Sequence, residues 1–184
     1  MSSITTSTEG NSQHPWVLAG SRPFWYAAYT YANHEKKAAA EISRRGVECF
    51  LPSYQTARRW SDRRVELEMP LFPGYVFVHL VLHDRLKVLQ VPGVARLVGF
   101  GGLPVALPDE QIDALRAGLN GRLRAEPHPF LTVGRRVRVK RGPLAGMRGI
   151  LLRKKGKFRL VISIDLIQRS MAVDADVADV EPEQ

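Results

Sequence analysis

The sequence predicts an α+β protein of two domains. The first is an αβ sandwich, in which helices pack on a sheet, and the second is a small five-stranded β-barrel. Strand-like and amphipathic helical segments alternate over residues 23–119. Residues 120–129 contain two prolines and show no apolar periodicity, which is typical of a linker. From Phe130 onward, short apolar runs alternate with glycine-containing turns. We therefore expect a flexible tail at 1–22, domains at 23–119 and 130–184, and a linker at 120–129.

The segment Leu71–Val78 is the most apolar part of the chain and predicts the central strand of the first domain. Pro73 fixes φ and Gly74 tolerates a positive φ, so a sharp turn is expected before the strand. The residues from Tyr75 to Val78 are all β-branched or aromatic, as in a strand buried on both faces. Alternation places Tyr75 and Phe77 on one face of this strand.

The remaining elements of the first domain follow from periodicity and turn residues. Asn33 is the candidate N-cap of a helix whose apolar positions include Ala38 and Ile42. The predicted order is strand 24–29, helix 34–45, strand 47–51, a hairpin around 58–69, strand 75–78, helix 83–90, strand 94–100 and helix 109–118. This order resembles a ferredoxin-like sandwich, with helices on one face of the sheet.

The second domain is predicted to be a barrel with an uneven charge. Its expected strands are 136–140, 149–152, 158–164, 168–173 and 177–180. Eleven basic and no acidic residues occur between Arg135 and Ile164, whereas five acidic and no basic residues occur between Asp174 and Gln184. The turn at Gly142-Pro143 is expected to present Leu144 on the barrel rim, and Gly149 to permit close approach of a neighbouring strand.

Composition narrows the class of function. The net charge of +9 favours polyanionic partners: nucleic acid, a membrane surface or the ribosome. The chain has a single cysteine, Cys49, which excludes an internal disulfide and fits a reducing compartment. It contains no run of about 18 apolar residues, so the sequence predicts no membrane span. The start of the chain lacks the pattern of a secretory signal, so we expect a cytoplasmic protein.

Motifs for catalysis, metals or cofactors are missing from the sequence. No phosphate-binding glycine loop occurs, and the five histidines have no metal-ligand spacing among themselves or with Cys49. Ser61-Asp62 with a distant histidine is too weak a pattern for a catalytic triad. The sequence therefore predicts a binding protein without catalytic residues, metal or cofactor.

Four arginines flank Trp60 at the tip of the predicted hairpin. They are Arg58, Arg59, Arg63 and Arg64. Such a run is either a solvated charged loop or a finger that contacts phosphates and stacks a base on its aromatic ring. The pattern alone leaves both interpretations open.

Two sets of motifs resemble the NusG family of transcription factors. Trp25–Tyr29, Leu71–Val78, Pro92-Gly93-Val94 and Gly101-Gly102-x-Pro104 are similar to its N-terminal (NGN) domain. Val133–Gly149 resembles its KOW motif, which lies in an SH3-like barrel. The resemblance covers about residues 24–181 and implies a transcription elongation or antitermination factor.

Two departures make the chain similar to specialised paralogues, the RfaH and UpxY types. Ile164–Val173 replaces a segment typical of the general factor, and Arg59–Arg64 resembles the UpxY type. We therefore expect an operon-specific factor. The alternatives are a general housekeeping NusG-type factor, or a ribosome-associated RNA-binding KOW protein, which the eleven basic residues suggest.

The resemblance also implies partners and contact residues. It implies RNA polymerase binding by Tyr29, Phe72, Tyr75, Phe77 and Leu97. It implies contacts with the non-template DNA strand by Tyr31, His34, Lys37 and Arg44. The four hairpin arginines are nucleic-acid candidates from their charge pattern and not from the resemblance.

For the barrel, the resemblance implies a small-subunit ribosomal protein as the partner. Its contact residues would be Leu144, Met147, Ile164, Leu166 and Ile167. The replaced segment argues against recruitment of the termination factor Rho. We expect the protein to act as a monomer.

Overall fold

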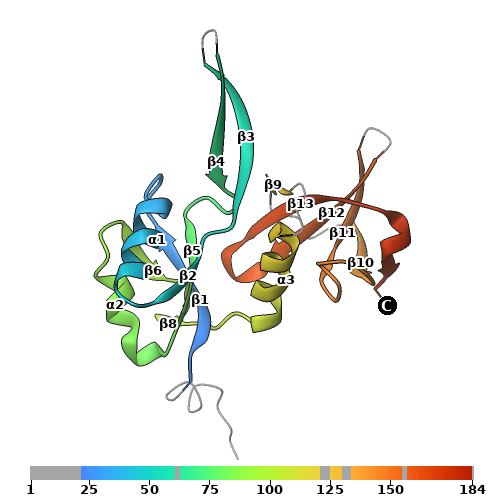
Figure 1. Cartoon of the computed structure of the whole chain (residues 1–184). Helices are drawn as coiled ribbons and strands as arrows, with labels where there is room; N and C mark the ends of the chain where they lie inside the picture. Colours follow the sequence, from blue (N-terminus) through green and yellow to red (C-terminus); the bar gives the residue numbers. More distant parts are fainter. Residues whose placement is uncertain (1–21, 61–62, 121–124, 130–133, 155–156, 184) are drawn as a thin grey trace, which may run out of the picture.

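Two antiparallel sheets, one from each half of the chain, organise this computed structural model (Figure 1). The structure describes residues 22–60, 63–120, 125–129, 134–154 and 157–183. The predicted N-terminal tail therefore lies outside the described residues, apart from Arg22.

The first sheet has four strands in the order β2-β5-β1-β6. These are β1 (Phe24–Thr30), β2 (Glu48–Phe50), β5 (Tyr75–Leu80) and β6 (Val94–Leu97). Strand β5 lies between β2 and β1, with Tyr75 opposite Tyr29 and Phe77 opposite Ala27. The prediction of a central strand after the Pro73-Gly74 turn is confirmed.

Helices cover both faces of this sheet. Helix α1 (Glu35–Arg44) and the short α2 (Leu86–Leu89), which follows a 3-10 turn at Leu82–Arg85, pack on one face with Val76 and Val78. Helix α3 (Asp109–Asn120) packs on the opposite face, where Ile112 and Leu115 join the cluster that contains Phe77. The expectation of helices on a single face is wrong for α3.

The start of α1 also differs from the prediction. Asn33 has φ of 63°, a left-handed conformation, and the N-cap residue is His34, which makes no side-chain capping bond. Asn33 therefore turns the chain and does not cap the helix, a use to which asparagine is suited.

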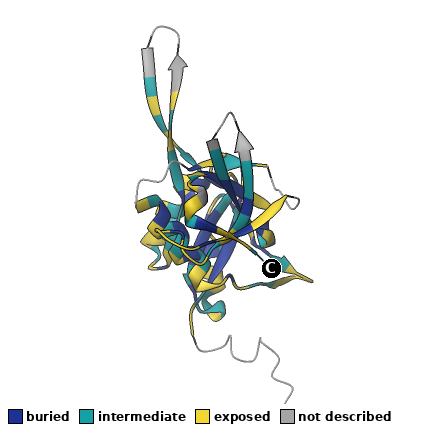
Figure 2. Ribbon diagram, turned by 90° about the vertical axis from the view of Figure 1, so that its right-hand side faces the viewer, coloured by how far each residue is buried: buried dark blue, intermediate teal, exposed yellow. Residues whose placement is uncertain are grey.

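Two hairpins extend from the first domain. Strands β3 (Ser53–Trp60) and β4 (Arg63–Pro70) pair along their whole length and project away from the sheet (Figures 1 and 2). The much shorter β7 (Gly99–Phe100) and β8 (Leu103–Pro104) pair around a Gly101-Gly102 turn.

The second sheet has six strands in the order β14-β10-β11-β12-β13-β9. Gln168, in a left-handed conformation, follows the 3-10 turn Asp165–Ile167. Four of the five strands expected from the sequence are present near their predicted positions, whereas the fifth, expected at 177–180, begins only at Val180 because Val177–Asp179 forms a 3-10 turn. Their bounds are β10 (Arg135–Val139), β11 (Arg148–Lys154), β12 (Lys157–Ile164), β13 (Arg169–Ala175) and β14 (Val180–Pro182), the last preceded by a 3-10 turn at Val177–Asp179. The sixth, β9 (Ala125–His128), comes from the segment predicted to be the linker and pairs with β13.

Gly149 occupies the close approach that the sequence predicted. A Cβ atom placed there would lie 2.6 Å from the carbonyl oxygen of Val161 on β12, which no side chain tolerates. The residue thereby allows β11 to lie against β12 at this point.

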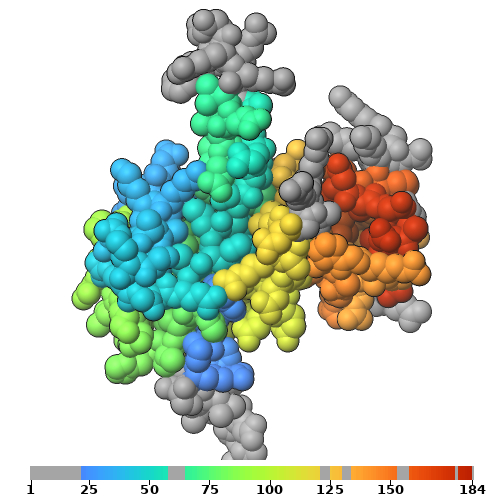
Figure 3. Space-filling model, in the orientation of Figure 1, coloured from blue at the N-terminus to red at the C-terminus, as the bar shows by residue number. Residues whose placement is uncertain are grey.

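The two halves share one hydrophobic cluster. It runs from Trp25, Phe72 and Phe77 in the first domain to Leu144 and Ile162 in the second. Helix α3 lies between the two sheets and touches both sides (Figures 1 and 3). Among the described helices, none is both long and apolar enough to span a membrane.

Candidate partner-binding face

Tyr29 and Tyr75 form a pair on the face of the first sheet that α1 and α2 leave open. They are direct cross-strand neighbours, and their ring centroids lie 5.4 Å apart with the planes tilted by 55°. Both side chains are only half-buried. A half-exposed tyrosine pair presents apolar ring surface together with two hydroxyls, which suits a protein interface.

Phe72 and Phe77 support this pair from within the core. Their exposed fractions are 1% and 0%, and the rings meet edge to face with centroids 5.9 Å apart. Phe50 also packs against Phe77, with ring centroids 6.3 Å apart. In this conformation these two predicted contact residues are therefore packing residues that fix the strand carrying Tyr75.

Leu97 lies apart from the other four predicted residues. It is buried in the cluster beneath α1 and α2, on the opposite face of the sheet. We therefore leave it out of the candidate face, which we define as Tyr29, Phe72, Tyr75 and Phe77.

Two arginines lie over the tyrosine rings. The guanidinium carbon of Arg96 is 5.4 Å from the ring centroid of Tyr29, and that of Arg169 is 5.8 Å from the centroid of Tyr75. Arg96 belongs to β6, whereas Arg169 begins β13 of the barrel. The barrel thus contacts the candidate face directly. The sequence holds no local signal for these contacts, because the partners are 67 and 94 residues apart.

The turn before β5 is held by a buried carboxylate. Glu35 is only 6% exposed, and its Oε1 accepts a hydrogen bond of 2.8 Å from the Gly74 N–H. The Gly74 carbonyl in turn accepts a bond of 2.8 Å from the Thr30 N–H. Gly74 has φ of 85°, and a Cβ there would lie 3.3 Å from the Tyr29 ring. These contacts tie the start of α1 to the strand ends that carry the tyrosines.

Arg116 fastens α3 to the same face. Its Nη2 donates to Glu48 Oε1 at 2.8 Å, and its guanidinium carbon lies 4.6 Å from the Trp25 ring centroid and 5.1 Å from that of Phe50. His79 Nδ1 lies 3.0 Å from the other Glu48 oxygen. Hydrogen bonding by Arg116, and to a lesser extent by His79, lowers the pKa of Glu48 below its usual value. The sequence reading missed this cluster, which long-range pairing assembles.

The barrel also packs against α3. Leu115, Gly118 and Leu119 of α3 lie beside Leu144, Met171 and Val173 of the barrel. Gly118 is buried at this contact and lines the small gap between the helix and the barrel.

The residues predicted to contact DNA lie around the start of α1. Tyr31 is 60% exposed, and its ring stands edge-on to His34 with centroids 6.2 Å apart. The Tyr31 N–H donates to the Gly93 carbonyl at 2.9 Å, and a Cβ on Gly93 would lie 2.9 Å from His34. The loop at Gly93 therefore fixes the backbone beneath both rings. Lys37 is exposed on the same helix.

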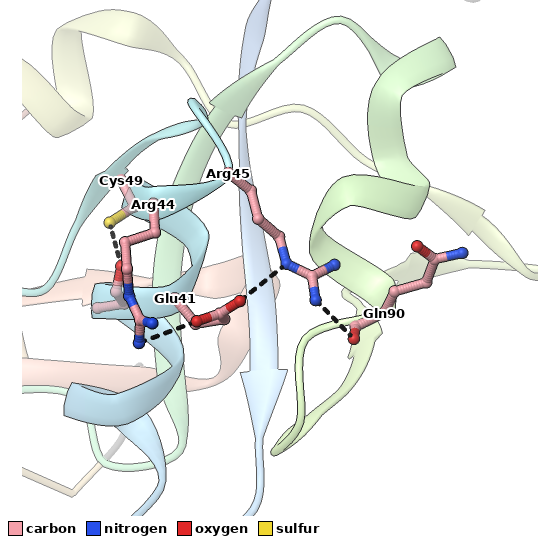
Figure 4. Close-up of polar contacts among 6 residues, drawn as sticks. Glu41, Arg44, Arg45, Cys49 and Gln90 are labelled. Carbon is pink, nitrogen blue, oxygen red and sulfur yellow. Dashed lines mark hydrogen bonds and ion pairs between the residues drawn. The ribbon is translucent and has the colours of Figure 1, made fainter.

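Arg44 lies at the far end of α1 and is already paired. Its Nη2 lies 2.9 Å from Glu41 Oε2, while Arg45 lies 3.2 Å from the other Glu41 oxygen and donates to the Gln90 carbonyl at 3.3 Å (Figure 4). A phosphate contact by Arg44 would have to compete with Glu41. For the four hairpin arginines, the structure describes the paired backbone, and their side chains lie outside the described residues.

The residues predicted to bind the barrel's partner fall into two groups. Leu144, Ile164 and Ile167 are buried, whereas Met147 and Leu166 are half-buried. Leu144 also lines a cavity of about 100 Å³ whose other walls include Leu160, Val173 and several aspartates. Within the described residues, no group of three or more His, Cys, Asp or Glu side chains is placed to hold a metal ion.

Comparison with known proteins identifies the family. The family model described as "Transcription termination factor nusG" matches residues 23–116, about half of the chain. The chain belongs to the NusG family. NusG of Staphylococcus carnosus, named a transcription termination/antitermination protein, is 29% identical over 175 residues, covering 85% of this chain and 94% of that protein. NusG of Escherichia coli K12, named in the same way, is 28% identical over 173 residues.

A solved NusG structure has the same fold. The structure titled "Domain interaction in Thermotoga maritima NusG" aligns with a TM-score of 0.58 at 24% identity, over 89% of this chain and 98% of that one. The expected α+β architecture, an NGN domain followed by a β-rich KOW domain, is thereby confirmed. This chain is a NusG-type transcription factor.

Proposed function

We propose that this NusG-family protein binds RNA polymerase through the candidate face and suppresses pausing or termination during elongation. The observation that carries the proposal is the half-exposed pair of Tyr29 and Tyr75, which is supported by the fully buried Phe72 and Phe77. Rigid aromatic side chains that keep part of their surface exposed are typical energetic centres of protein interfaces. Tyr29 and Tyr75 would make the contact, and Phe72 and Phe77 would hold them in place.

Polymerase binding at this face would compete with the barrel. Arg169 lies over Tyr75 in this structure, so a partner covering that ring must displace it. The Arg169 contact alone contributes little to this competition, since an exposed cation–π contact is worth about 0.5–1 kcal/mol. Contacts of α3 with Leu144, Met171 and Val173 add to it.

The start of α1 would read the non-template DNA strand. Tyr31 is exposed for stacking on a base, and His34 and Lys37 are exposed beside it. Stacking and phosphate contacts are the usual basis of single-strand binding. The hairpin arginines and Arg44 would extend this surface, and the net charge of +9 supports it.

The barrel would recruit a small-subunit ribosomal protein. Met147 and Leu166 are the predicted residues with exposed surface, while Leu144, Ile164 and Ile167 would support them. We propose no recruitment of Rho, because Ile164–Val173 differs from the segment of the general factor.

We further propose an operon-specific factor that acts as a monomer in the cytoplasm. The general NusG role is the second candidate, and the names of the relatives favour it. Deletion of the gene distinguishes the two by RNA sequencing. A specialised factor alters one or a few long operons, whereas a general factor alters transcription broadly.

The direct test is capture of purified RNA polymerase by a Tyr29→Ala, Tyr75→Ala double variant. The control is Phe24→Ala, because Phe24 is a half-buried aromatic of the same β1 strand. It carries an arginine over its ring, with Arg22 at 4.4 Å, but packs toward the α1–α2 face. We expect loss of binding in the double variant and retention in the control. A folded double variant that binds fully would contradict the proposal, and co-purification with ribosomes but not polymerase would favour the ribosome-associated alternative.

A further inference from the structure

Strand β9, from the segment between the two domains, covers the edge of β13 in the barrel. Strand β9 comes from the connection between the domains and pairs Ala125 with Val173, Glu126 with Ala172, Pro127 with Met171 and His128 with Ser170. By contrast, β13 pairs with β12 over seven positions. The segment joining the domains is therefore partly incorporated into the sheet.

We infer that the β13 edge is a binding surface for the chain's own segment Ala125–His128, and that detachment of this strand releases the barrel from the first domain. Any effect of this release on polymerase binding rests on the proposed function. The pairing of the strand and its effect on the separation of the domains do not depend on that function.

The sequence of β9 suits a short edge strand. Pro127 has no N–H, so it fits the position opposite Met171 only if its nitrogen points away from the β13 ladder. A proline in this place also blocks addition of a further strand on the outer side. Ala125, which is buried, contributes only a methyl group to the core.

One arginine joins three strands at this edge. Arg159 of β12 forms an ion pair with Glu126 of β9, lies 3.5 Å from Asp174 of β13, and donates to the Ala172 carbonyl at 3.4 Å. The Arg159 side chain is 16% exposed, but that of Glu126 is 51% exposed, so the ion pair is only partly shielded from water. Four paired residues, one buried methyl and one half-exposed ion pair make β9 a strand that opens locally.

Detachment would change the length of the tether between the domains. Four residues separate Asn120, the end of α3, from Ala125, and such a segment spans at most roughly 15–20 Å. With β9 released, the tether extends from Asn120 to Arg135 and reaches roughly 50 Å. The docked strand thus keeps Leu144 and Met171 near α3 and Arg169 near Tyr75, and the released strand lets the barrel leave.

The test uses the full chain without polymerase. Glu126→Arg places a cation beside Arg159 and should detach β9. The matched control is Glu183→Arg, which breaks the 3.0 Å pair with Arg148 and makes the same charge change away from β9. Amide hydrogen exchange at positions 126 and 128 reports strand docking. Spin labels at Ala40→Cys and Ala145→Cys, in a Cys49→Ser background, report the separation of the domains.

We expect exchange at 126 and 128 to rise about fivefold or more in Glu126→Arg and the spin–spin distance distribution to broaden, with neither change in Glu183→Arg. A disulfide between Ala125→Cys and Val173→Cys, added to Glu126→Arg, should restore the narrow distribution. Unchanged exchange in Glu126→Arg would overturn the inference. So would faster exchange with an unchanged distance distribution, because the tether would then not hold the domains together. Loss of polymerase binding alone would bear only on the proposed function.

Discussion

The two faces of the first sheet are made by the same strands yet are closed in different ways. Val76 and Val78 of β5 are fully buried beneath α1 and α2, which follow their strands closely in the sequence. On the other face, α3 packs over part of the sheet, and Tyr75 stays half-buried with Arg169 of the barrel over its ring. The first face is sealed by elements that are near in the sequence, whereas part of the cover of the second face comes from the other half of the chain.

This difference corresponds to the residue types. The sealed face is mostly aliphatic, with Tyr26, only 2% exposed, as the exception, and aliphatic side chains suit permanent burial because they have no polar group to satisfy. Tyrosines on the second face keep hydroxyls that suit a surface buried only when a partner arrives. Strand alternation therefore separates a packed face from the proposed binding face within β5.

The largest expected effect tests whether the second face also contains core. Phe77→Ala should lower the free energy of unfolding by about 3–5 kcal/mol, because the ring is fully buried and contacts both Phe50 and Phe72. Urea denaturation followed by circular dichroism measures it. Ile42→Ala on the sealed face, expected to cost about 2–5 kcal/mol, is the comparison. A loss of less than about 1 kcal/mol in the free energy of unfolding for Phe77→Ala would show that Phe77 is not a core residue.

The next effect concerns the turn that positions Tyr75. Glu35→Ala leaves the Gly74 N–H without its acceptor and should cost about 1–3 kcal/mol. Glu35→Gln keeps an oxygen acceptor and should cost less. Equal losses in both variants would indicate that the negative charge at the start of α1, and not the bond to Gly74, is what matters.

The contribution of the Arg116–Glu48 ion pair, which attaches α3, to the free energy of unfolding should depend weakly on pH. The pKa of Glu48 is lowered in the folded state, so its stabilising effect is present above the usual value of about 4.5 and is lost as pH falls through the lower folded value. Because Glu48 is half-exposed, Glu48→Gln should cost less than about 1 kcal/mol at pH 7.

Unfolding measured from pH 7 to pH 3 checks this prediction. The difference between wild type and Glu48→Gln should shrink on acidification. A difference that grows as pH falls would contradict the assignment of the Arg116–Glu48 pair.

The smallest effect tests the contact between the domains. Arg169→Ala should change the free energy of unfolding by no more than about 0.5 kcal/mol, since Arg169 is exposed. Polymerase affinity should rise about two- to fivefold, because one contact that covers Tyr75 is removed. Binding titrations measure this change, and Arg138→Ala, another exposed arginine of the barrel, is the control. Reduced affinity would instead place Arg169 in the polymerase contact.

Local patterns in the sequence predicted much of this fold. Pro73-Gly74 marked the turn before β5, alternation separated Phe77 from Val78, and Gly149 marked a close strand approach. The candidate tyrosines came from the family resemblance combined with that alternation. Each of these features depends on residues within a few positions of one another.

Features assembled by long-range pairing could not be read in the same way. Arg116 and Arg169 are ordinary surface arginines in the sequence, and only the fold brings them over aromatic rings. The prolines of 120–129 indicated a linker and gave no sign of a strand. Strand β9 was missed because Ala125–His128 pairs with β13, some 45 residues later in the sequence. Leu97 follows the apolar pattern of a face residue, but the register of β6 turns it toward α1 and α2.

Photo-crosslinking to polymerase tests the difference between the two faces most directly. Tyr75→p-benzoylphenylalanine places the probe on the proposed binding face, and Phe24→p-benzoylphenylalanine places it toward the sealed face of the neighbouring strand. We expect a strong crosslink to an RNA polymerase subunit from position 75 and little from position 24. Equal crosslinking from both positions, or crosslinking from position 24 alone, would contradict this expectation.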